Sequence, residues 1–66
     1  MNKRLKKIRE GRGFSQREVA NAIGITISGY SNYEQGIREP SIEIIIKLCK
    51  FFNVSADYLL GLKDFE

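Results

Sequence analysis

Apolar positions along this chain fall into short segments that are separated by residues which break regular structure. The breaks lie at Gly11, Gly13, Gly24, Gly36, Pro40 and Asn53. The segments between these breaks open with residues that commonly cap the start of an α-helix. The pattern therefore predicts an all-α fold with five short helices, the first of them in the N-terminal segment.

The second segment begins with a capping box. Ser15 and Glu18 lie three residues apart, so the side chain of each can accept a hydrogen bond from the backbone amide of the other. Phe14 before this cap and Val19 beyond it can pack together as a hydrophobic staple. Further N-caps are expected at Thr26, Ser41 and Ser55. These local signals predict where four of the five helices begin.

Residues 41–53 carry two conflicting patterns. The β-branched residues Ile42, Ile44 and Ile46 alternate with other residues, as they would in a strand. The helical spacing i, i+3, i+4, i+7 is matched by Ile45, Leu48, Cys49 and Phe52, with Ile42 and Ile46 on the same flank. The segment is long for a strand and the chain has no second strand to pair with it. We therefore predict a helix, with Cys49 as a core thiol.

Residues 16–35 contain the most informative pattern. Gly24 lies where one helix should end, and Thr26 begins the next helix almost at once. Two helices joined by so few residues cross steeply and touch only through small or well-shaped side chains, and Ala20 supplies a small one. The other contacts are expected from Val19, Ile23, Ile25, Tyr30 and Tyr33. The pattern predicts two tightly linked helices.

The second of these helices leaves a polar, almost uncharged face exposed. The face consists of Thr26, Ile27, Ser28, Ser31, Asn32 and Gln35. Hydroxyl and amide side chains can donate and accept hydrogen bonds, which is what recognition of base edges in the DNA major groove requires. Charged side chains would instead bind phosphates without regard to base sequence. This face therefore favours a partner made of double-stranded DNA.

Composition narrows the classes of function. The chain has 66 residues, enough for one domain, and we expect that domain to span residues 1–66 with a core from about residue 5 to residue 62. It contains no His and one Cys, which excludes an internal disulfide, a Ser-His nucleophile pair and an imidazole metal site. We expect no enzyme, no metal and no cofactor, and no small-molecule ligand is evident.

Charge is distributed unevenly along the chain. Up to and including Arg17 there are seven cations and one anion, whereas the remainder holds four cations and seven anions. Such asymmetry indicates a polyanionic partner, nucleic acid first and an anionic membrane surface second. The alternative is a solvated basic helix that serves solubility. The longest apolar run is Ile44 to Ile46, so we expect no membrane span and a cytoplasmic location.

Several motifs together resemble one family. They are SQREVA from Ser15, NAIGIT from Asn21, SNYEQG from Ser31, REPS from Arg38 and VSADYLLG from Val54. With these motifs the chain resembles the lambda-repressor-like helix-turn-helix domains of the Cro/repressor (XRE) family from about residue 5 to residue 62. The resemblance implies five helices, of which the second and third form a DNA-binding unit.

The resemblance also implies roles for individual residues. The expected base contacts are Ile27, Ser28, Ser31 and Asn32. The expected phosphate contacts are Gln16, Arg17, Thr26, Gln35 and Arg38. Arg9 and Glu34 are expected to form a structural ion pair between the first helix and the end of the third. Ile27 departs from the family pattern, because many members carry Gln or another polar residue there; its side chain can pack on a thymine methyl group instead.

The C-terminal segment is more apolar than a chain end needs. Tyr58, Leu62 and Phe65 are the expected contacts of a homodimer, since domains of this type bind palindromic half-sites. We therefore predict a transcriptional regulator, most simply a repressor that occupies a palindromic operator through its third helix. The alternative is a protein-interaction module, or an antitoxin-type partner-binding domain, on the same fold.

Overall fold

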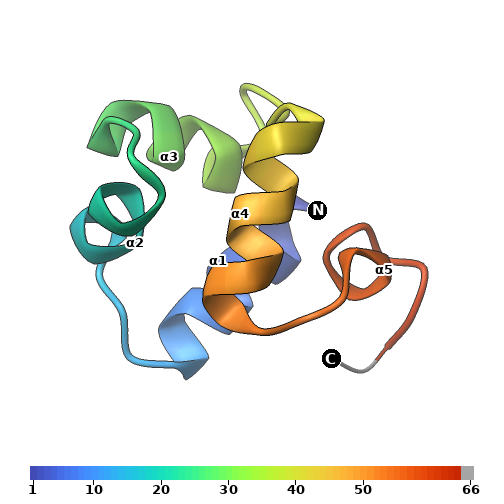
Figure 1. Cartoon of the computed structure of the whole chain (residues 1–66). Helices are drawn as coiled ribbons and strands as arrows, with labels where there is room; N and C mark the ends of the chain where they lie inside the picture. Colours follow the sequence, from blue (N-terminus) through green and yellow to red (C-terminus); the bar gives the residue numbers. More distant parts are fainter. Residues whose placement is uncertain (65–66) are drawn as a thin grey trace.

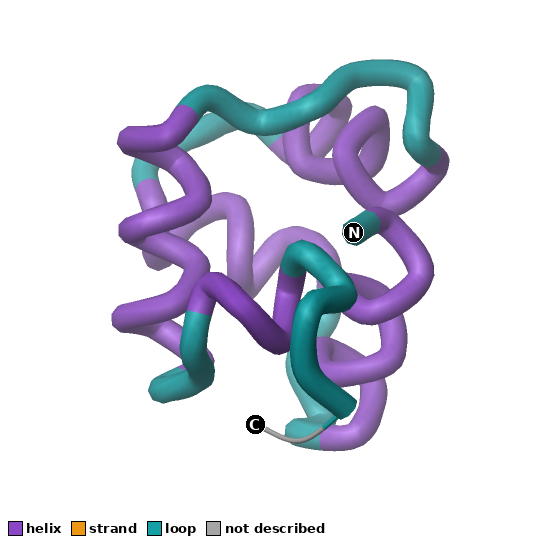
Figure 2. Tube along the Cα trace, turned by 90° about the vertical axis from the view of Figure 1, so that its right-hand side faces the viewer, coloured by secondary structure: helices purple, strands orange, loops and turns teal. Residues whose placement is uncertain are grey.

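A computed structural model of the chain describes residues 1–64, and these fold into five helices with no strand among them (Figures 1 and 2). The helices are α1 (Asn2–Gly11), α2 (Gln16–Ile23), α3 (Ile27–Gln35), α4 (Ile42–Phe52) and α5 (Ala56–Leu59). In Figure 1, α3 lies above α2 on the left, and α4 stands upright in the centre with α1 behind it. Helix α5 lies at the right, on the other side of α4 from α2 and α3. The predicted all-α class and the five helices are confirmed.

Capping at both ends fixes the length of α2. The Ser15 hydroxyl oxygen accepts a hydrogen bond from the Glu18 amide at 3.0 Å, and the Glu18 carboxylate accepts one from the Ser15 amide at 2.8 Å. At the other end Gly24 has a φ of 78°, a left-handed conformation that side chains disfavour. The amide of Ile25 then reaches back to the carbonyl of Ala20 at 3.0 Å. The helix therefore ends abruptly, as its sequence predicts.

Only residues 24–26 separate α2 from α3. The Thr26 hydroxyl oxygen starts α3 by accepting a hydrogen bond from the Gly29 amide at 3.0 Å. A Cβ atom at Gly29 would lie 3.1 Å from that same oxygen, which is closer than ordinary van der Waals contact. Gly29 therefore leaves the capping hydroxyl uncrowded, and this offsets part of the helix propensity that glycine loses relative to alanine.

One hydrophobic cluster joins all five helices. Its buried members are Leu5, Ile8, Val19, Ala20, Ile23, Tyr30, Leu48, Phe52, Val54, Tyr58 and Leu59. Ala20 is fully buried, where its small side chain allows α2 to pack closely against its neighbours. The Phe51 ring packs against Phe14 and Phe52, with ring centroids 4.9 Å and 5.0 Å apart. The core thus fixes α2 and α3 on the other helices.

The segment with conflicting patterns is helix α4, but its apolar flank is not all buried. Leu48 and Phe52 lie in the core, whereas the side chains of Ile42 and Ile46 are 76% and 48% exposed. Within residues 1–64, the outer side of the first turns of α4 thus stays exposed. Cys49 is half-buried beside the core, and burial raises the pKa of its thiol.

The capping box makes a measurable prediction. Changing Ser15→Ala removes the side-chain acceptor of the Glu18 amide, and we expect a loss of about 1 kcal/mol in the free energy of unfolding. Urea denaturation followed by circular dichroism measures the difference. Ser28→Ala is the matched control, because Ser28 is exposed inside a helix and caps nothing. An equal loss in both variants would contradict the capping role.

Candidate nucleic-acid interface

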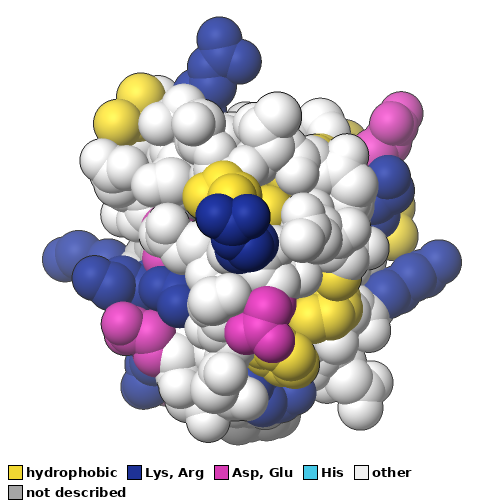
Figure 3. Space-filling model, turned by 90° about the vertical axis from the view of Figure 1, so that its left-hand side faces the viewer, with side chains coloured by type: hydrophobic (Ala, Val, Ile, Leu, Met, Phe, Trp, Pro, Cys, Tyr) yellow, Lys and Arg dark blue, Asp and Glu magenta, His cyan; other side chains and the backbone are white. Residues whose placement is uncertain are grey.

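The side chains on the outer face of α3 differ in their exposure to solvent. Thr26 and Ser28 are exposed, and Ile27 is 37% exposed. Ser31 and Asn32 are half-buried. Figure 3 shows the side of the molecule that carries α2 and α3: uncharged atoms dominate it, while Lys and Arg side chains project at its edges and near its centre. The outer face of α3 thus carries no charged side chain of its own, while Lys, Arg, Asp and Glu side chains all lie elsewhere on the same side of the molecule.

Part of this face is ordered by its own hydrogen bonds. The Gln35 side-chain amide donates to the Ser31 hydroxyl at 2.8 Å. The Asn32 backbone carbonyl accepts from the amides of Ile37 and Arg38 at 3.0 Å and 3.3 Å, which fixes the start of the loop after α3. Arg38 is exposed on that loop. The fold thus presents a basic side chain just beyond the C-terminal end of the polar face.

A polar cluster under the face links α1, α2 and α3. Arg9 Nε donates to Glu34 Oε2 at 2.5 Å, and Arg9 Nη2 donates to Glu34 Oε1 at 3.1 Å. Gln16 Nε2 donates to the same Oε1 atom at 3.1 Å, and Arg9 Nη1 donates to the Phe14 carbonyl at 2.8 Å. The side chains of Glu34 and Arg9 are only 2% and 11% exposed. The expected pair is thus a bidentate contact with a third member, Gln16.

Burial and charge perturb the protonation of this cluster. Burial alone would raise the pKa of Glu34, but hydrogen bonds, first from Arg9, outweigh it and hold that pKa below its ordinary value of 4.5. Glu34 in turn raises the pKa of Arg9. Burial raises the pKa of Tyr30, and the neighbouring carboxylate raises it further although the two groups lack hydrogen-bond geometry. At neutral pH the cluster is therefore a carboxylate held by a guanidinium beside a neutral phenol.

The link between Gln16 and Glu34 is absent from the sequence-based interpretation. The sequence predicts a phosphate contact for Gln16 and an ion pair for Glu34, and 18 residues separate the two. No local pattern connects positions that far apart in two different helices. Arg17, one residue further along, is exposed and points to no partner among the described residues. The structure therefore joins the N-terminal end of α2 to the C-terminal end of α3.

Two of the three residues expected at a homodimer contact, Tyr58 and Leu62, differ in exposure. Tyr58 is only 6% exposed, because it packs in the core and the Arg4 guanidinium lies 4.9 Å from its ring centroid. It therefore offers little surface to a second copy. Leu62 is 74% exposed and remains available. Phe65 lies outside the described residues.

Arg4 explains how the C-terminal segment is held. Its Nη1 atom donates to the Tyr58 carbonyl at 3.2 Å and also to the Lys63 carbonyl, and its Nη2 atom contacts Asp64 at 3.2 Å. The first helix thus binds the end of the described chain through one side chain.

None of the helices within residues 1–64 combines the length and apolar character that a membrane crossing requires.

Five helices in this arrangement, with a three-residue turn between the second and third, define the lambda-repressor-like helix-turn-helix fold. Over residues 5–59 the chain matches the helix-turn-helix family, and it belongs to that family in its XRE-type branch. The resemblance predicted from the motifs is confirmed. The family is one of transcription regulators rather than enzymes, in agreement with the expectation from composition.

Similar proteins support this assignment. The HTH-type transcriptional regulator ImmR of Bacillus subtilis is 43% identical over 61 residues, which cover 92% of this chain and 48% of that protein. The regulator SinR in complex with DNA is 30% identical, with a TM-score of 0.82 over 89% of this chain and 98% of that one. The P22 c2 repressor with a synthetic operator is 26% identical, with a TM-score of 0.83 over 88% of both chains. The chain spans about half the length of the curated relatives it matches.

Proposed function

We propose that this chain binds double-stranded DNA in a sequence-specific manner and regulates transcription, with α3 in the major groove. The observation that carries the proposal is the uncharged polar face of α3, held from behind by the cluster of Arg9, Gln16 and Glu34. A rigid helix with hydrogen-bonding side chains suits base recognition, because its donors and acceptors are already positioned before binding. The solved DNA complexes of similar chains support the same reading.

Four residues in the first two thirds of α3 recognise the bases. Ser28 is exposed and can donate to or accept from base edges, and Asn32 can form a bidentate pair with adenine. Ile27, 37% exposed beside them, packs on a thymine methyl group. Ser31 contributes its hydroxyl while accepting from Gln35. These four residues set which base pairs are preferred.

Phosphate contacts surround the base-reading residues. Gln16 lies at the start of α2, where free amides and the helix dipole favour an anion. Arg17 is exposed on α2, before α3, and Arg38 is exposed on the loop after α3. Thr26 and Gln35 lie at the two ends of α3 itself. Phosphate contacts fix the register of the protein and make affinity depend steeply on salt, but carry no base preference directly.

The operator is a palindrome bound by a homodimer. A two-fold dimer places two copies of α3 in successive major grooves, about one helical turn apart. The exposed Leu62, with Leu60 at 47% exposure nearby, supplies apolar surface for the second copy, in place of Tyr58. Occupation of an operator that overlaps a promoter makes the protein a repressor. Such a role requires a cytoplasmic location, where the operator DNA lies.

The proposal is tested by variants on a selected operator. Duplexes bound by the chain are first enriched from a random pool. Ser28→Ala and Asn32→Ala should then each reduce discrimination at one base pair by about 1–3 kcal/mol, whereas Arg38→Ala should weaken binding to all duplexes alike. Fluorescence anisotropy against the operator and its single-base variants gives these values. A uniform loss from Ser28→Ala and Asn32→Ala, with base preference intact, would overturn base reading by α3.

A further inference from the structure

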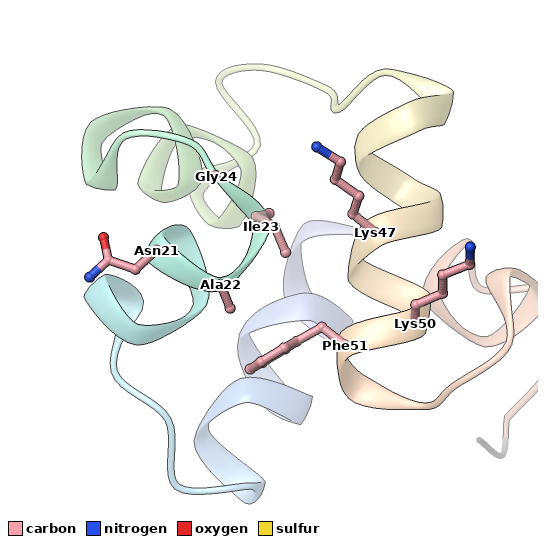
Figure 4. A pocket seen from close by; sticks show the side chains of 7 residues that line it. All are labelled: Asn21, Ala22, Ile23, Gly24, Lys47, Lys50 and Phe51. Carbon is pink, nitrogen blue, oxygen red and sulfur yellow. The ribbon is translucent and has the colours of Figure 1, made fainter.

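An open groove of about 550 Å³ lies between the C-terminal end of α2 and the second half of α4. Its floor is apolar, made by Ala22, Ile23 and Phe51. Figure 4 shows the Phe51 ring and the Ile23 side chain lying between the two helices, with the Lys47 amine projecting from α4 above them. Lys50 stands on the outer edge of the same helix. The groove therefore combines an apolar floor with a basic rim.

Lys47 and Lys50 are not among the residues proposed to contact DNA. Of the four cations in the acidic part of the chain, Arg38 belongs to that surface and Lys63 lies 3.7 Å from Asp57. Lys47 and Lys50 are exposed and form no ion pair with any residue in the described range 1–64. Both project from α4, which forms one of the two walls of the groove. Their charge is therefore available to a ligand in the groove.

The groove is separate from the base-reading face. On the α2 side it is lined by residues 21–23 and by the capping residue Gly24, at the opposite end of that helix from Gln16. None of its lining residues belongs to α3 or to the loop that carries Arg38. Duplex DNA is a poor occupant, because phosphates would pair with the lysines but leave the Phe51 ring and Ile23 uncovered. A ligand that buries the apolar floor must therefore carry an apolar side chain of its own.

We propose that this groove docks a short acidic segment of a partner protein, with an apolar side chain over Phe51 and carboxylates beside Lys47 and Lys50. An amphipathic helix laid along a groove buries its apolar side chains, and complementary charge at the rim sets partner choice and speeds association. Aromatic floors of this kind concentrate binding energy in a few contacts. The segment binds beside α3 rather than on it, so one copy of the chain holds DNA and the partner together.

Peptide selection tests the proposal without knowledge of the partner. A displayed library of random peptides of about 12 residues, enough for three helical turns, is selected on the wild-type chain. Counter-selection uses the double variant Lys47→Glu/Lys50→Glu. We expect enriched peptides to carry Asp or Glu beside Leu, Ile or Phe, and the synthetic peptide to bind the double variant about tenfold more weakly. Amide NMR shifts should map to residues 21–24 and 47–51.

Matched variants separate the groove from general charge effects. Lys3→Glu/Lys6→Glu makes the same change in net charge on α1, which contributes no residue to the groove, and should leave peptide binding unchanged. Ala22→Gln adds neutral bulk to the exposed floor and should weaken binding without any change in charge. Circular dichroism checks that each variant is folded.

Three results would overturn the proposal. They are selected peptides that lack acidic residues, equal binding to the Lys47→Glu/Lys50→Glu variant, and displacement of the peptide by operator DNA with shifts on α3. The last result would assign the groove to the nucleic-acid surface. Operator binding by the double variant is measured in parallel, so failure of peptide docking is distinguished from failure of the proposed DNA function.

Discussion

Changing Glu34→Ala is expected to lower the free energy of unfolding by about 3–5 kcal/mol and to weaken operator binding in the same variant. The substitution leaves the Arg9 guanidinium, 11% exposed, without its carboxylate, and an uncompensated buried charge is costly. It also removes the acceptor of Gln16 and so frees the N-terminal end of α2 from α3. A domain of this size has a total stability of only about 3–10 kcal/mol, so the variant should be partly unfolded at 37 °C.

Urea denaturation and anisotropy on the selected operator measure the two effects together. Glu10→Ala is the control, because Glu10 lies 4.0 Å from the same guanidinium but its side chain is 58% exposed, and that pair should contribute less than about 1 kcal/mol. The double variant Arg9→Met/Glu34→Leu should recover most of the stability, since neither charge is then buried alone. An unchanged melting temperature in Glu34→Ala would contradict the role of the cluster.

The same cluster predicts how stability changes with pH. Because the pKa of Glu34 is lower in the folded chain than its ordinary value of 4.5, the folded state binds that proton less readily than the unfolded state. Its contribution is therefore fully present above the ordinary value and is lost as pH falls through the folded value. Wild type should lose stability on acidification below about pH 4.5 more steeply than Glu34→Gln. Parallel curves for the two chains would show that Glu34 is not the group responsible.

The second large effect is expected from the aromatic centre of the core. Phe52 is fully buried, and its ring contacts Phe51 and Phe14 with centroids 5.0 Å and 6.2 Å away. Changing Phe52→Ala should lower the free energy of unfolding by about 3–5 kcal/mol, because the surrounding side chains cannot fill the ring-sized cavity that is left. Its carbonyl accepts from Arg12 at 2.6 Å, a bond that the substitution does not remove.

Thermal unfolding followed by circular dichroism is sufficient to measure this change. Ile42→Ala removes apolar atoms from the same helix at a position that is 76% exposed, and should change stability by less than about 0.5 kcal/mol. Similar losses from Phe52→Ala and Ile42→Ala would mean that α4 packs through a different face. The comparison therefore tests the orientation of α4 directly.

Local patterns predicted the start and end of the helices well, because capping depends on residues close together in sequence. Ser15 with Glu18, and Thr26 with Gly29, form hydrogen bonds that span only three residues. The steep turn at Gly24 follows from one left-handed residue. These features are local, so the helix-turn-helix unit can be predicted from the sequence without knowledge of the core.

Most contacts between distant segments cannot be predicted from local spacing, and the Arg9–Glu34 pair was expected only because the family resemblance implies it. The hydrogen bond from Gln16 to Glu34 and the contacts of Arg4 with the C-terminal segment join residues that no local spacing relates. Helical periodicity placed Ile42 and Ile46 on an apolar flank, but whether another element covers a flank depends on the whole fold. The same limit applies to Tyr58, which is apolar enough for an interface and is instead buried within its own chain.

Binding of double-stranded DNA by the outer face of α3 can be tested by an amide NMR titration of the chain with its selected operator. We expect amide shifts concentrated at Gln16, Arg17, residues 26–32 and Arg38, with binding that weakens steeply as salt rises from about 50 mM to about 200 mM. No binding to any duplex at low salt would favour a protein-interaction module. Shifts confined to α4 and α5, with residues 26–32 unchanged, would show that α3 does not bind the DNA.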